Sequence, residues 1–262
     1  AIKGMAARHA EFGAAVLDHL PFATYQGQLT LPDILARQPV TEQGKRPLYF
    51  FTHEADANQF NALCQARGVL AINAGRPFDE TLLRRYAGQY AETIELKPLD
   101  RLDDPAWYEK LAADEQIAYQ RLERALDRVL AEREVAVRTQ VRRFQPATLS
   151  AVLLAGQRVT AFDAMERMLE KPFALDGLAE LAGEVRDRLR QHPLTLFLNA
   201  EHPLVQRLGA LTEPDHPRYR SILTGLYYSA LLNAQHRLTP AVAQRFHADL
   251  QELLGEYLSR SC

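Results

Sequence analysis

Residues 197–208, with the sequence FLNAEHPLVQRL, place an amide, a carboxylate and an imidazole in one short stretch. A histidine of this kind can act as a general base in hydrolysis or proton transfer. The same pattern fits a strand that ends at Asn199 and a helix that begins at His202 and Pro203, because proline is favoured in the first turn of a helix. No nucleophile or carboxylate partner for His202 is apparent in the sequence. We therefore interpret His202 as a hydrogen-bonding residue at the start of a helix.

Other patterns that carry chemistry are absent from the sequence. The turn after the first predicted strand reads THEAD (52–56), without the glycines that let backbone amides approach a pyrophosphate, and GxxxxGK[ST] does not occur. There is no GxSxG turn, Cys64 has no neighbouring signature of a cysteine nucleophile, and the histidines form no HExxH pair. The sequence therefore predicts no catalytic residue, no cofactor site and no metal site in this chain.

Composition narrows the class of protein further. The formal net charge of −2 argues against a protein that binds nucleic acid by general attraction to phosphate. Nucleic-acid binding remains a minor hypothesis because of the basic strand VRTQVRRF, in which Arg138, Arg142 and Arg143 lie beside Phe144. No apolar run approaches a membrane span, and Cys64 and Cys262 match no disulfide or metal spacing. We expect a cytoplasmic protein without nucleic-acid or membrane partners.

The first part of the chain predicts a small α/β domain over residues 1–103. Short buried strands alternate with amphipathic helices, and this alternation indicates a short parallel sheet with flanking helices. Residues 22–47 are rich in Gly and Pro and predict turns with one short helix. The expected strands are 47–52, 69–73 and 92–97, and the expected helices are 2–20, 31–36, 53–68 and 77–88.

Residues 104–262 predict an α+β domain that ends in helices. A long charged helix is expected over 105–132, followed by a hairpin of the strands 135–144 and 148–155 through a turn at 145–147. One further strand, 194–199, is expected among helices. The remaining helices are predicted near 161–170, 177–190, 203–211, 216–233 and 239–260.

Two apolar surfaces remain as candidates for function. The segment 160–173 carries two of the three methionines at helical spacing, and a methionine-bearing face adapts to irregular partners. An ordinary helix that faces the core fits this segment as well. The candidate residues for contact with other proteins are Phe162, Met165, Met168 and Leu169.

The second apolar surface is the pair of C-terminal helices, which carry more apolar face than one partner surface needs. Two such helical hairpins can bury this excess in a dimeric four-helix bundle. The alternative interpretation is that the hairpin docks onto the chain's own core. Of the two, we favour dimerisation. The predicted interface consists of Leu223, Leu226, Tyr227, Ala230, Leu231, Val242, Phe246, Leu250, Leu253 and Tyr257.

Six stretches together resemble a known family. They are QLTLPDIL (28–35), LYFFTHEADANQF (48–60), RGVLAI (67–72), RRFQPATLSAVLLAG (142–156), FLNAEHPLVQRL (197–208) and LYYSALLNAQHRLTPAVAQRFHADLQELL (226–254). In order and spacing they resemble the C-terminal half of bacterial heat-shock protein 90 chaperones, from the small α/β part of the middle domain to the end of the dimerisation domain. The motif Asn-x-x-His-Pro-Leu-Val and the final helix pair are the most specific of these features.

The resemblance implies a homodimeric, ATP-dependent chaperone of protein folding and the stress response that binds non-native client proteins. It also implies that the domain that binds ATP and magnesium precedes Ala1 in a longer protein and that this chain is non-catalytic. In the family, an amphipathic helix of the C-terminal domain faces the dimer cleft and contacts clients. The matching segment here contains Phe162, Met165, Met168 and Leu169.

An alternative from another class is a small stand-alone enzyme with an α/β core and a helical cap. That reading predicts a concave pocket with perturbed ionisable side chains near the strand ends at Thr52, Asn73 and Lys97. A chaperone fragment instead predicts a constitutive dimer without ATP turnover.

Overall fold

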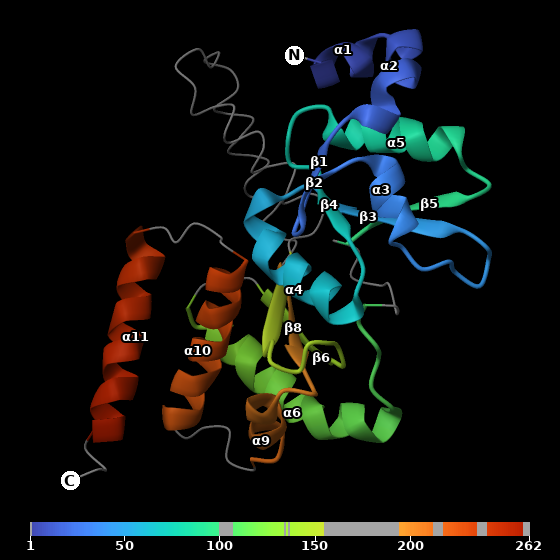
Figure 1. Ribbon diagram of the computed structural model, residues 1–262. Coiled ribbons are helices and arrows are strands. Elements are labelled where there is room, and N and C mark those ends of the chain that lie inside the picture. The colour runs from blue at the N-terminus through green and yellow to red at the C-terminus, as the bar shows by residue number, and fades with distance from the viewer. Residues whose placement is uncertain are drawn as a thin grey trace. The chain divides into compact units, whose positions relative to one another are not determined.

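The computed structural model describes residues 2–99, 107–133, 135, 137–154, 194–211, 217–234 and 240–258 (Figure 1). The chain divides into two compact units, Ala1–Arg101 (unit 1) and Leu102–Cys262 (unit 2), next to the boundary predicted at residue 103. Each unit has its own mixed α/β fold and its own hydrophobic core. None of the helices in the described ranges combines the length and the apolar composition needed to cross a bilayer.

Unit 1 contains a five-stranded mixed sheet with the strand order β2-β1-β4-β3-β5. The three strands expected from the sequence pair in parallel, β4 with β3 and β3 with β5, which confirms the parallel core of the prediction. The bounds of the strands are β1 (Phe22–Thr24), β2 (Gly27–Leu29), β3 (Arg46–Phe51), β4 (Ala71–Asn73) and β5 (Ile94–Pro98).

The hairpin β1–β2 was missed by the sequence prediction, which assigned turns to this region. Its two strands pair antiparallel, and β1 continues the sheet through an antiparallel contact between Ala23 and Asn73. Gly27 has a φ of 102°, a conformation that glycine adopts without strain. Phe22 is fully buried, so a single aromatic side chain anchors a strand of three residues. Strands this short give too little periodicity to be recognised.

The predicted helix over residues 2–20 is broken into two helices and a 3₁₀ turn. Arg85 donates hydrogen bonds to the carbonyl oxygens of Ala6 and Ala7, which lie in the last turn of the first helix. Gly13 approaches the Ala6 carbonyl so closely that an added Cβ would lie 2.5 Å from that oxygen. The helices of unit 1 are α1 (Ile2–Arg8), α2 (Ala10–Val16), α3 (Leu31–Ala36), α4 (Ala57–Arg67) and α5 (Asp79–Gln89), with 3₁₀ turns at Leu17–His19 and Glu54–Asp56.

Local sequence signals explain the ends of two of these helices. The hydroxyl of Thr30 accepts a hydrogen bond from the Asp33 backbone amide at the start of α3, as a helix cap does. Gly68 ends α4 in the left-handed conformation with a φ of 65°, at the residue where the sequence predicts the helix to end. Both caps satisfy backbone groups that the helix itself leaves without partners.

Unit 2 contains a three-stranded sheet with the order β6-β8-β7, formed by β6 (Val137–Arg142), β7 (Ala151–Leu154) and β8 (Leu194–Asn199). The predicted hairpin between the first two strands is wrong, because β8 lies between them, parallel to β6 and antiparallel to β7. The reason is burial. Five of the six residues of β8 are buried, so this apolar strand takes the centre, and the alternating strand β6 takes an edge.

The helices of unit 2 are α6 (Ala113–Ala131), α9 (Pro203–Gly209), α10 (Pro217–Asn233) and α11 (Pro240–Leu258). The long helix predicted from residue 105 begins only at Ala113, because Glu109 forms an antiparallel bridge with Arg143 instead. Helices α10 and α11 lie side by side at one edge of the unit (Figure 1). The helices predicted near 161–170 and 177–190 lie outside the described residues.

Candidate functional site

The stretch that first suggested chemistry, residues 197–208, is a structural joint. His202 precedes α9, and its Nδ1 accepts a hydrogen bond from the Leu204 backbone amide at 3.2 Å. The imidazole therefore acts as the N-cap of the helix, as the sequence predicts. The nearby carboxylate of Glu201 accepts from the Arg143 guanidinium at 2.6 Å.

Asn199 holds the loop between β6 and β7 against the end of β8. Its amide nitrogen donates to the carbonyl oxygens of Pro146 (3.2 Å) and Leu149 (3.0 Å). Its amide oxygen accepts from the backbone amides of Phe144 (3.3 Å) and Glu201 (3.0 Å). The side chain is fully buried and uses all of its hydrogen-bonding capacity, which leaves it no group for catalysis.

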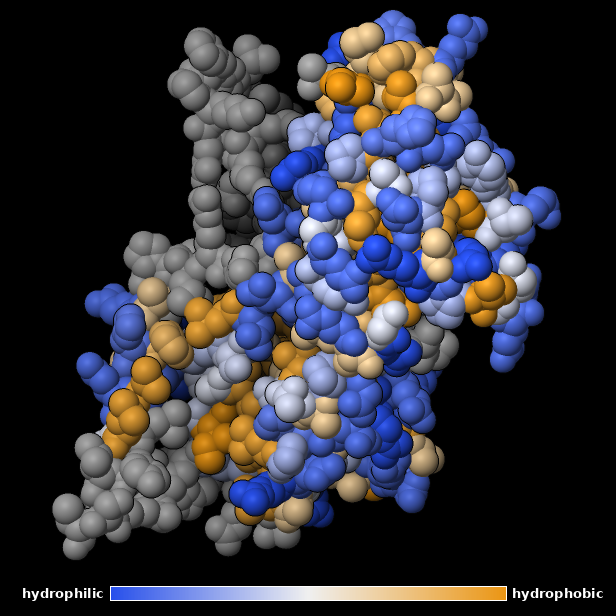
Figure 2. Space-filling model, in the orientation of Figure 1, coloured by the Kyte–Doolittle hydropathy of each residue, from blue (hydrophilic) through white to orange (hydrophobic). Residues whose placement is uncertain are grey.

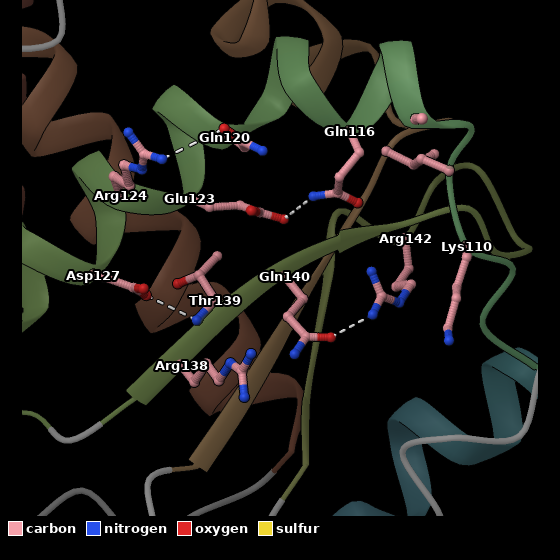
Figure 3. Close-up of a pocket in the computed structure, with 12 residues that line it drawn as sticks. Lys110, Gln116, Gln120, Glu123, Arg124, Asp127, Arg138, Thr139, Gln140 and Arg142 are labelled. Atoms are coloured by element: carbon pink, nitrogen blue, oxygen red, sulfur yellow. Dashed lines mark hydrogen bonds between the residues drawn. The ribbon is translucent and has the colours of Figure 1, made fainter.

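A polar cleft lies between α6 and the edge strand β6 (Figure 3). It has a volume of about 680 Å³ and belongs entirely to unit 2. The polar face of α6 forms one wall, and β6 with the segment before α6 forms the other. The residues that line it are Lys110, Leu111, Ala113, Gln116, Gln120, Glu123, Arg124, Asp127, Arg138, Thr139, Gln140 and Arg142.

Two acids of α6 close the free edge of β6. The Asp127 carboxylate accepts a hydrogen bond from the Thr139 backbone amide at 2.8 Å, and Glu123 accepts one from the Val141 amide at 2.7 Å. These bonds satisfy strand donors that would otherwise be open to pairing with another chain. Glu123 also accepts from the Gln116 side chain at 2.9 Å. The main role of both acids is therefore to hold α6 against the edge of β6.

Cationic side chains dominate the rest of the cleft. Arg142 donates to the Gln140 side chain at 2.5 Å, and its guanidinium lies 5.6 Å from the centre of the Phe197 ring. Burial and the neighbouring charge of Arg138 lower the pKa of Arg142, and the carboxylate of Glu123 opposes this shift. Within the described part of the chain, no carboxylate forms an ion pair with the four cations Lys110, Arg124, Arg138 and Arg142.

The remaining residues of the basic strand are not open to a ligand. Arg143 forms ion pairs with Glu115 at 2.8 Å and with Glu201 at 2.6 Å, and these two carboxylates raise the pKa of its guanidinium. Phe144 is buried and packs edge-on against Tyr108. The arrangement that motivated the nucleic-acid hypothesis, arginines around an accessible aromatic ring, is therefore not formed here.

The predicted dimer residues separate into two groups. The five on α10 are buried in the core of unit 2 within a single chain, so the reading in which α10 docks onto the chain's own core describes them. This group is Leu223, Leu226, Tyr227, Ala230 and Leu231. They can therefore contribute to a dimer interface only indirectly, by holding α11 in position.

Helix α11 carries the apolar surface that remains exposed. Leu250 is 39% exposed, and Leu254, which the sequence prediction omitted, is 54% exposed. Phe246 is half-buried and packs against Tyr228 of α10 with ring centres 4.9 Å apart. Figure 2 shows apolar side chains along the exposed side of this helix. The side chains of Val242, Leu253 and Tyr257 lie outside the described part of the structure.

The other candidates give no catalytic geometry. The residues predicted to contact client proteins, Phe162, Met165, Met168 and Leu169, lie outside the described residues. Of the strand-end residues that the enzyme alternative names, Asn73 accepts from the Gly75 backbone amide, and Lys97 pairs with Glu95. The cleft described above is lined only by residues of the other unit.

Neither the free thiol nor the acidic side chains form a reactive centre in the described ranges. Cys64 is fully buried, and burial raises the pKa of its thiol to about 12, which keeps it protonated. Among the described residues, no group of three His, Cys, Asp or Glu side chains could hold a metal ion.

A scan of protein-family models and a search of curated proteins found no match to this sequence.

The polar cleft was not predicted from the sequence. Its signals were present separately, as the alternation of VRTQVR and as polar residues at helical spacing in α6. The sequence did not show that these two faces meet. They meet because β8 lies between β6 and β7, which leaves β6 as an edge strand beside α6.

Proposed function

We propose that this chain is the dimerisation and client-contact part of an ATP-dependent chaperone of the heat-shock protein 90 family, acting in protein folding and the stress response. The observation that carries the proposal is the apolar stripe of α11, which is wider than its contact with α10. Polar contacts anchor one side of the helix, since Asp249 accepts from Tyr228 at 3.1 Å and pairs with Arg133 at 3.0 Å.

The other side of α11 leaves leucine side chains in water. Leu250 follows Asp249 by one residue, which turns its side chain by about 100° around the helix axis. Leu254 lies one turn further along the same side, and both are exposed. Burial of a leucine side chain stabilises a complex by about 1.5–3 kcal/mol. A second copy of α11 would bury these leucines symmetrically, as a twofold interface requires.

The order of elements in unit 2 supports the same proposal. A long helix, the strands of a small mixed sheet and a terminal pair of helices occur in this order, and side-chain hydrogen bonds of Asn199 and His202 hold the joint between β8 and α9. The most specific motif of the sequence resemblance coincides with this joint.

Client contact is tested by replacing the two methionines of the proposed client segment. We expect the wild-type chain to suppress aggregation of reduced insulin, measured by light scattering, and Met165→Ser with Met168→Ser to lose most of this suppression. Met5→Ser is the matched control, because Met5 is the third methionine and is exposed on α1. Equal suppression by the double variant and the wild type, or none by the wild type, would overturn the client assignment.

A further inference from the structure

The cleft between α6 and β6 gathers more positive charge than the fold neutralises. Its lining includes the cations Lys110, Arg124, Arg138 and Arg142 but only two acids, in a chain whose overall charge is −2. Both acids are already engaged by backbone amides of β6. Like charges gathered in a concavity repel one another and attract an anionic ligand.

The spacing of these groups suits an extended ligand. Arg138, Gln140 and Arg142 occupy alternate positions of β6, so their side chains point to the same side at intervals of roughly 6.6 Å. Figure 3 shows these three side chains projecting from the strand on the side away from α6. An extended peptide repeats its own side chains at the same interval, which lets carboxylates face the two arginines in register.

The polar neutral residues of the cleft favour a peptide over other anions. Gln140 lies between the two arginines on the same side of β6, and its amide nitrogen can donate to a peptide carbonyl while its amide oxygen accepts from Arg142. Sites for single-stranded nucleic acid combine a positively charged groove with aromatic side chains on which bases stack, and the described residues that line the cleft include no aromatic ring. Phe197 lies beneath Arg142 but is itself buried.

We propose that the cleft between α6 and β6 binds an extended peptide segment with acidic side chains at alternate positions. Arg138 and Arg142 take its carboxylates, and the amide nitrogen of Gln140 donates to its backbone. The site is independent of the apolar face of α11, so it adds a charge-selective contact to the proposed function and does not depend on dimerisation.

The test measures binding of a fluorescein-labelled octapeptide, with glutamate at every second position and serine between, to the full chain by fluorescence anisotropy. We expect saturable binding that weakens as salt is added, because salt screens contacts between exposed charges. The same peptide with glutamine in place of glutamate should not bind. Equal binding of the two peptides would overturn the proposal.

Two double variants with the same change of charge locate the site. Lys110→Gln with Arg138→Gln removes two exposed cations of the cleft, and we expect the Kd to rise at least roughly fivefold. Arg121→Gln with Arg207→Gln removes two exposed cations outside it and should leave the Kd unchanged. If both double variants weaken binding equally, the attraction is not local to the cleft.

Two competitors distinguish the peptide from other anions. Neither a single-stranded oligothymidylate nor tripolyphosphate should displace the labelled peptide at concentrations where unlabelled peptide does. Displacement by tripolyphosphate at an equal or lower concentration would make the cleft a phosphate site, and the same result with the oligonucleotide would make it a nucleic-acid site. Either result would overturn the peptide proposal.

Discussion

Single buried polar residues in this chain divide into those that use their hydrogen-bonding groups and those that do not. Asn199 uses every group of its side chain to join β8 to the loop before β7. Thr224 donates to the Arg220 carbonyl at 3.0 Å. The hydroxyl of Thr139, in contrast, is buried without a hydrogen-bond partner among the described residues. An unsatisfied buried hydroxyl destabilises a fold.

This contrast gives a prediction at the residue scale. We expect Thr139→Val to raise the free energy of unfolding of unit 2 by about 1 kcal/mol, because the valine removes an unsatisfied hydroxyl at nearly constant volume. Thr224→Val is the matched control and should lower it by about 1 kcal/mol, since it removes a hydrogen bond that is made. Denaturant titration followed by the fluorescence of Trp107, the single tryptophan, measures both. A loss of stability in Thr139→Val would contradict the argument.

The thiol of Cys64 allows a second prediction at this scale. Its pKa is raised to about 12 in the folded chain, so the folded state keeps a proton that the unfolded state loses above its ordinary value near 9. The contribution of this thiol to the free energy of unfolding of the wild type should therefore fall as the pH rises from about 9 toward 12. Comparison with Cys64→Ala at pH 8 and pH 10 isolates the effect from the titrating tyrosines. A difference between the two proteins that is independent of pH would contradict it.

At the scale of elements, the edge of β6 depends on acids from a helix. The Asp127 carboxylate accepts from the Thr139 amide, so Asp127→Ala leaves a strand donor unpaired. We expect this change to destabilise unit 2 by about 1–2 kcal/mol. Asp127→Asn keeps an oxygen at the same place and should retain most of the stability. Equal losses in the two variants, measured by the Trp107 transition, would show that the hydrogen bond does not matter.

Elements with strong local signals could be predicted from the sequence, and so could the parallel pairing in unit 1, but the partners of the strands in unit 2 could not. The strand 194–199 and the cap at His202 were recognisable because an apolar run, a turn residue and a proline follow in order. The pairing of β6 with β8 brings together segments separated by more than fifty residues, and periodicity carries no information about that contact. The hairpin prediction was wrong because it paired β6 with the next strand along the chain.

The same limit applies to the candidate sites. The excess apolar face of the terminal helices was visible in the sequence, but its division into a buried half on α10 and an exposed half on α11 follows from packing against β7 and α6. Leu254 was omitted because near-heptad spacing selects its neighbour Leu253 instead. The structure describes Leu254 as exposed, which places it on the proposed interface.

At the scale of the whole molecule, the two units have separate hydrophobic cores and we expect them to unfold separately. Trp107 belongs to unit 2, so its fluorescence is used to follow that unit. Ile72→Ala in unit 1 should leave the Trp107 transition in place while circular dichroism shows an earlier transition. Leu196→Ala should lower the stability measured at Trp107 by about 2–5 kcal/mol. A shift of the Trp107 transition by Ile72→Ala would show that the units unfold together.

The central claim is that the exposed face of α11 joins two copies of the chain, and sedimentation velocity tests it most directly. We expect the wild type to sediment as a dimer at micromolar concentration. Leu250→Asp with Leu254→Asp should weaken the dimer roughly a hundredfold or more and give a folded monomer, because charges replace side chains that the interface buries. Val40→Asp with Ile117→Asp alters two exposed apolar residues elsewhere and should leave the dimer intact. A monomeric wild type, or a dimer that survives both substitutions on α11, would contradict the account.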